Sequence, residues 1–127
     1  MLLAVLSLTR ATAQDAKPAL FTADQASAGA TTYAQTCAAC HGTQLEGVAA
    51  PALKGPSFGE LAIAQTLNVQ TLLESTAATM PQSDPGALKP EEYAAVVAYI
   101  LQQNGYPAGT TPLISGAAGM KETKVTP

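Results

Sequence analysis

The feature that most constrains this sequence is the pentapeptide Cys37-Ala38-Ala39-Cys40-His41, a C-x-x-C-H motif. On a helix, positions i, i+3 and i+4 lie on one face, so both thiols and the imidazole can meet one face of a flat molecule. The spacing is typical of covalent attachment of a c-type haem, in which the thiols bond to the porphyrin and the histidine binds its iron. The motif therefore predicts one haem c, held through Cys37 and Cys40, with His41 as an axial ligand.

The motif uses every cysteine and histidine of the chain, which has two cysteines and one histidine. A structural zinc site needs about four such ligands, so zinc is disfavoured. A redox dithiol of the thioredoxin type would lie near a βαβ unit, and the sequence has no convincing strand pattern. A disulfide between Cys37 and Cys40 would close a very small loop and add little stability. The dithiol and the disulfide remain the alternatives to haem attachment.

The chain has 127 residues, enough for one domain. Apolar residues make up 47% and charged residues only 12%, which is not the composition of a disordered protein. A domain of this length buries a modest core by itself. A haem would add a large apolar surface to that core.

Residues 1–13 resemble a secretory signal peptide, with an apolar run followed by the small-residue cleavage pattern Ala11-Thr12-Ala13. The run lacks the usual basic start and carries Arg10 near its end, as expected of a signal whose beginning lies upstream of Met1. It is too short to span a bilayer, and no later segment approaches ~18 apolar residues. We therefore expect a soluble, exported protein located in the periplasm, without a membrane span.

Cleavage after Ala13 would remove Arg10 and no acidic residue, which takes the formal charge from −3 to −4. An acidic surface repels phosphate groups. The charge therefore argues against nucleic acid and anionic lipid as partners.

Helix signals predict an all-α chain with long irregular connections. Residues 14–21 form a flexible lead-in, and Thr22 with Gln25 fits a capping box for a helix to about Ala39. A second helix follows Asn68. The last helix begins at Pro90 and carries an apolar stripe at helical spacing: Tyr93, Val96, Val97, Ile100 and Leu101.

The segments between and after these helices are rich in Gly and Pro. Residues 43–56 and 77–89 are predicted to be irregular loops. Residues 110–127 show no periodicity and are predicted to be a flexible C-terminal tail. The folded domain is then expected at 22–109.

Four features in order resemble a class I cytochrome c: Cys37 to His41, Pro51-Ala52-Leu53, Met80-Pro81, and Tyr93 to Tyr99. The likeness covers Ala23 to Gly109. It implies a small all-α cytochrome c fold of about three to five helices around one covalently bound haem, with the first and last helices crossing.

The resemblance also implies roles for single residues. His41 and Met80 would be the two axial ligands, and the Pro51 carbonyl would hold the outer ring nitrogen of His41. Leu53 would pack on the haem. At the helix crossing, Gly29 and Tyr33 would meet Tyr99.

The stretches Ala52 to Pro56 and Gly105 to Gly109 look most like the cytochrome c domain or subunit associated with periplasmic quinone-cofactor dehydrogenases. The implied protein is an electron carrier and not an enzyme. Its donor would be a periplasmic dehydrogenase, and its acceptor another cytochrome or a terminal oxidase. The alternative is an open-site haem protein, a peroxidase or gas binder, in which Met80 does not ligate.

Lysines are too few for the basic ring with which mitochondrial-type carriers dock, because only Lys54 and Lys89 lie near the expected folded body. We therefore expect a small apolar docking patch beside the haem edge. Its residues would be Ala38, Ala39, Ala49 and Ala50 on the cysteine side and Ala78, Thr79, Pro81 and Gln82 beside Met80.

Overall fold

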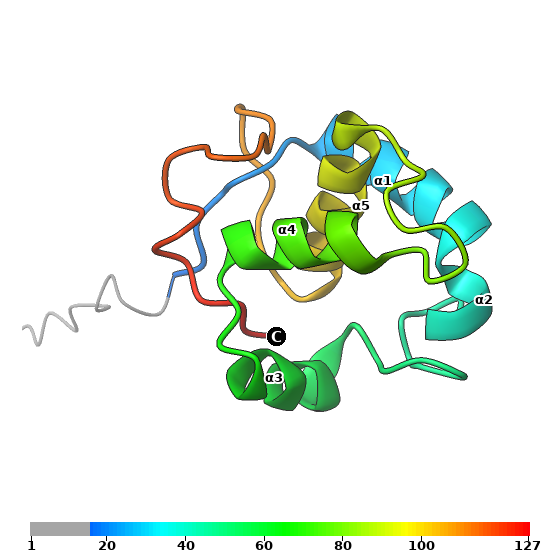
Figure 1. Ribbon diagram of the computed structural model, residues 1–127. Helices are drawn as coiled ribbons and strands as arrows, with labels where there is room; N and C mark the ends of the chain where they lie inside the picture. The colour runs from blue at the N-terminus through cyan, green and yellow to red at the C-terminus, as the bar shows by residue number, and fades with distance from the viewer. Residues whose placement is uncertain (1–15) are drawn as a thin grey trace, which may run out of the picture.

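A computed structural model describes residues 16–127, and the predicted signal peptide lies outside this range. Within it the chain forms five α-helices and two isolated β-bridges, so the all-α prediction is confirmed (Figure 1). The helices are α1 (Ala23–Thr36), α2 (Ala38–His41), α3 (Gly55–Ala64), α4 (Val69–Thr79) and α5 (Pro90–Gln103). No helix in residues 16–127 has the length and apolar character needed to cross a membrane.

The first predicted helix is divided in two. It starts at the expected N-cap, because the Thr22 hydroxyl accepts a hydrogen bond from the Gln25 backbone N–H at 3.1 Å. The capping box is incomplete, since the Gln25 side chain bonds to Leu113 and not back to Thr22. It ends at Thr36, and Cys37 leads into the single turn of α2. The buried Tyr33 hydroxyl donates to the Gly42 carbonyl at 2.7 Å and so fixes the end of α2 against α1.

Burial is the main reason that the pKa of Tyr33 is raised, to about 12, with Cys37, Tyr99 and Glu46 adding to it. The hydroxyl therefore keeps its proton, and its role as donor, throughout the neutral pH range.

The crossing of α1 and α5 forms the centre of the fold (Figure 1). A Cβ atom at Gly29 would collide with the backbone carbonyl of Ala95 and lie 3.0 Å from the Val96 nitrogen. The missing side chain therefore allows the two backbones to touch. The crossing is confirmed, with one correction. Gly29 meets Ala95, whereas Tyr33 meets Tyr99, with ring centroids 5.4 Å apart and planes at 54°.

The segment after α5 packs against the helices, in contrast to the flexible tail expected for residues 110–127. Leu113, Met120 and Val125 are 1%, 0% and 3% exposed. They occur without helical or strand periodicity, so a search for regular patterns passes over them. The segment that carries these three side chains covers the side of the molecule on which α4 begins.

Hydrogen bonds fasten this segment to α1 and α4. The Gln25 amide donates to the Leu113 carbonyl at 2.8 Å and accepts from the Leu113 N–H at 2.7 Å. The first N–H groups of α4, at Val69 and Gln70, donate to the carbonyls of Thr123 (3.0 Å) and Met120 (3.3 Å). A helix start leaves such N–H groups without partners inside the helix, and here the C-terminal segment supplies them.

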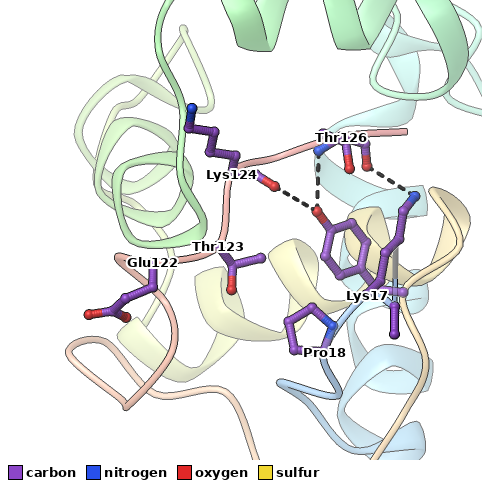
Figure 2. Close-up of a pocket in the computed structure, with 8 residues that line it drawn as sticks. Lys17, Pro18, Glu122, Thr123, Lys124 and Thr126 are labelled. Carbon is purple, nitrogen blue, oxygen red and sulfur yellow. Dashed lines mark hydrogen bonds between the residues drawn. The ribbon is translucent and has the colours of Figure 1, made fainter. Parts of the chain in front are cut away.

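A clamp of polar groups joins the two ends of the described chain (Figure 2). The Lys17 ammonium donates to the carbonyls of Asn104 at 2.6 Å and Thr126 at 3.3 Å, and it lies 4.9 Å from the centre of the Tyr106 ring. The Tyr106 hydroxyl donates to the Lys124 carbonyl and accepts from the Thr126 N–H. Burial lowers the pKa of Lys17. The described part of the lead-in is therefore held in place.

Candidate haem-binding site

The His41 side chain is held in one orientation at the end of α2. Its ring is 8% exposed, and Nδ1 lies 2.7 Å from the Pro51 carbonyl oxygen. A carbonyl can only accept, so Nδ1 carries the proton and Nε2 keeps a free lone pair. Within residues 16–127, every buried side-chain nitrogen or oxygen has a hydrogen-bond partner. Nε2 of His41 has no such partner among these residues, so it is not one of the buried atoms and faces accessible space. This is the arrangement of a metal-binding imidazole.

The loop after α2 brings Pro51 to His41. The carbonyl of Cys40 accepts hydrogen bonds from three successive N–H groups at 2.9–3.2 Å, those of Val48, Ala49 and Ala50. The Gly47 N–H donates to the His41 carbonyl at 2.7 Å. Of the loop predicted at 43–56, residues 43–54 are irregular and residues 55 and 56 begin α3. The hydrogen bonds to the Cys40 and His41 carbonyls fold residues 43–54 tightly around the attachment motif.

Both cysteines are free thiols, with Cys40 exposed and Cys37 partly buried. Burial raises the pKa of the Cys37 thiol.

Met80 lies at the end of α4 and is partly buried. Its N–H donates to the Thr76 carbonyl at 2.9 Å, and its carbonyl accepts from the Tyr93 hydroxyl at 2.6 Å. The end of α4 and the loop that follows it lie on the same side of the molecule as α2 in Figure 1.

Leu53 is partly buried and packs against the core. Its carbonyl accepts a hydrogen bond at 2.9 Å from the Asn104 side chain, whose oxygen also accepts from the Gly55 N–H at 3.1 Å. Asn104 is 5% exposed and follows α5 directly. Asn104 is not among the predicted site residues, although an asparagine directly after a helix often bonds to the backbone through its side chain.

The residues present fit a haem c. Two free thiols at the required spacing and an imidazole with Nε2 free are the groups that would hold the cofactor, and the thioether of Met80 is a candidate second iron ligand. Within residues 16–127 no group of three or more His, Cys, Asp or Glu side chains could hold a metal ion without such a cofactor.

A comparison with protein families shows what the chain is similar to. The family model described as "Cytochrome C oxidase, cbb3-type, subunit III" matches residues 24–100, which include the attachment motif, Met80 and most of α5. A search of curated proteins and a search of solved structures found no match. Residues 101–127, which contain Asn104 and the packed C-terminal segment, lie beyond the matched range.

Proposed function

The chain belongs to the family of cytochrome c domains that this model represents, and we propose that it carries single electrons through one haem c ligated by His41 and Met80. The observation that carries the proposal is the 2.7 Å contact between His41 Nδ1 and the Pro51 carbonyl, beside two free thiols. A bound haem would supply the Fe(III)/Fe(II) couple.

The residues of the chain would each have a simple task. Cys37 and Cys40 would hold the cofactor covalently, and His41 would bind the iron through Nε2. The Met80 thioether would be the second protein ligand and would favour the ferrous state, which would raise the reduction potential. With both positions filled, no site is left for a substrate. The protein is then a carrier, and not a peroxidase or gas binder.

The proposed setting is the periplasm, with a dehydrogenase as donor and another cytochrome or a terminal oxidase as acceptor. The family description names a subunit of a cytochrome c oxidase, which supports an oxidase as acceptor. The association with a quinone-cofactor dehydrogenase rests on the sequence resemblance alone. Separation of the native protein together with its bound partner would test it.

Replacement of Met80 tests the ligation. In the haem-loaded wild type, carbon monoxide should leave the reduced spectrum unchanged. Met80→Ala should bind carbon monoxide and lower the reduction potential by on the order of 100 mV, within the range of about 0.8 V that axial ligands control.

Met120→Leu is the matched control, because Met120 is the other methionine of the described chain and is fully buried. It should behave as the wild type does. A wild type that binds carbon monoxide as readily as Met80→Ala would overturn the ligation and favour the open-site protein.

A further inference from the structure

We propose that the Tyr93 hydroxyl is a positioning group for Met80: it closes the loop of residues 80–88 and keeps the sulfur of Met80 at the iron. This inference rests on the proposed ligation by Met80. Tyr93 acts through the backbone of the ligand residue and does not itself bind the iron.

The hydroxyl contacts both ends of the loop. It donates to the Met80 carbonyl at 2.6 Å and accepts from the Leu88 N–H at 3.4 Å. The directions follow from the partners, since a carbonyl only accepts and a backbone N–H only donates. One side-chain atom therefore joins the residue that opens the loop to the residue that closes it.

The loop itself has little to hold its shape. Residues 82–87 are all exposed. Two backbone hydrogen bonds lie inside it, from Asp84 N–H to the Pro81 carbonyl at 2.9 Å and from Ala87 N–H to the Asp84 carbonyl at 3.2 Å. A segment with few buried contacts opens easily, so a bond from outside the loop has a large share in fixing it.

Tyr93 is well placed to supply that bond. It lies in the first turns of α5 and is 4% exposed. Its helix is held against α1 by the contact of Gly29 with Ala95. The start of the helix is also capped, because the Glu92 carboxylate accepts from the Lys89 N–H at 3.1 Å. The hydroxyl therefore ties a weakly held loop to the most firmly packed helix.

A purely structural tyrosine would need only its ring in this position. A phenylalanine would fill the same space and leave the Met80 carbonyl without this partner. The hydroxyl thus separates the two interpretations, because its removal keeps the packing and loses the connection to Met80.

The test uses the haem-loaded ferric protein and imidazole, a small ligand that competes with the Met80 sulfur. If the hydroxyl favours the state with Met80 bound, Tyr93→Phe should bind imidazole about three- to tenfold more tightly than the wild type. This is the size expected for one hydrogen bond acting on a two-state equilibrium. The weak charge-transfer band of the ferric iron–sulfur bond should also fade at a lower temperature.

Tyr99→Phe is the matched control, because it removes a hydroxyl from the same helix outside the loop. It should bind imidazole as the wild type does. Imidazole affinity unchanged in Tyr93→Phe, or raised equally in Tyr99→Phe, would overturn the positioning role while leaving the ligation intact. The ligation itself would be overturned by a wild type that binds imidazole with the same affinity as Met80→Ala and lacks the iron–sulfur charge-transfer band. The positioning role would then fall with it.

Discussion

The two sides of the candidate haem site are held by different means. On the His41 side, the contacts are local: Cys37, Cys40, His41 and Pro51 fall within one short stretch, and backbone bonds from 47–50 close it. On the Met80 side, the contacts come from other elements of the fold, namely α5 and the C-terminal segment. Tyr93 holds the Met80 carbonyl, and the C-terminal segment holds the start of α4.

The contrast separates what a motif determines from what the tertiary fold determines. The imidazole can be oriented by a few neighbouring residues, since its partner lies on the next loop. The thioether depends on the placement of a whole helix and of the loop after it. Damage to the core should therefore affect the Met80 side more than the attachment side.

The largest expected effect is on the local side. The double variant Cys37→Ala/Cys40→Ala should lose covalent haem completely, because no other cysteine is present. Extraction with acid–acetone should move all the colour into the solvent. The wild type and Met80→Ala should both keep their colour with the protein. Freely extractable haem in the wild type would contradict the thioether assignment.

The next effect concerns the helix crossing on which both sides depend. Gly29→Leu should lower the free energy of unfolding by about 3 kcal/mol or more, because the added side chain meets the Ala95 backbone and not a movable side chain. Thermal or denaturant unfolding measures this. Ala28→Leu, on the exposed face of α1, is the control and should change little. Equal stability of the two variants would remove Gly29 from the crossing.

A smaller loss is expected from the C-terminal segment. Met120→Ala removes a fully buried side chain and should cost about 2 kcal/mol, and it should weaken Met80 ligation before haem attachment. Ile114→Ala, in the same segment but 62% exposed, should stay within about 0.5 kcal/mol of the wild type. If Met120→Ala and Ile114→Ala had the same midpoint of denaturant unfolding, the C-terminal segment would not contribute to the core.

The smallest effect is expected from salt. Ala39 and Ala49 of the predicted docking patch are exposed, and their neighbour Val48 is 74% exposed. An apolar patch gains little from long-range attraction, so the second-order rate with the electron donor should change less than about threefold between low and physiological ionic strength. A steep fall in the rate would indicate a charged docking site instead.

The sequence allowed the local features to be predicted because their signals are local. The C-x-x-C-H spacing, the Thr22 cap and the apolar stripe of α5 each depend on neighbours a few positions away. The Thr22 cap and the apolar stripe have the predicted form in the structure, and the motif forms a separate helical turn because α1 stops before Cys37. The role of Pro51 came from the resemblance, and the hydrogen bond to His41 is present.

The missed features are those without a repeating pattern. The burial of Leu113, Met120 and Val125 depends on the shape of the surface they cover, which the sequence does not display. The bonds of Asn104 and Tyr93 join loops to a helix end and to a helix start. A tyrosine on an apolar stripe is usually read as core, and its hydroxyl acquires a meaning only once the loop is placed.

The contact between Gly29 and Ala95 has a consequence for the time course of folding. It joins segments near opposite ends of the domain, so the long chain between them must first be closed into a loop at an entropic cost. The attachment motif lies inside that loop and needs only a single helical turn to align its groups. We expect His41 to regain the iron of the already attached haem before the crossing forms. Hydrogen exchange during refolding of the haem-loaded protein should then show a spectrum with His41 bound while amides of α1 and α5 still exchange freely.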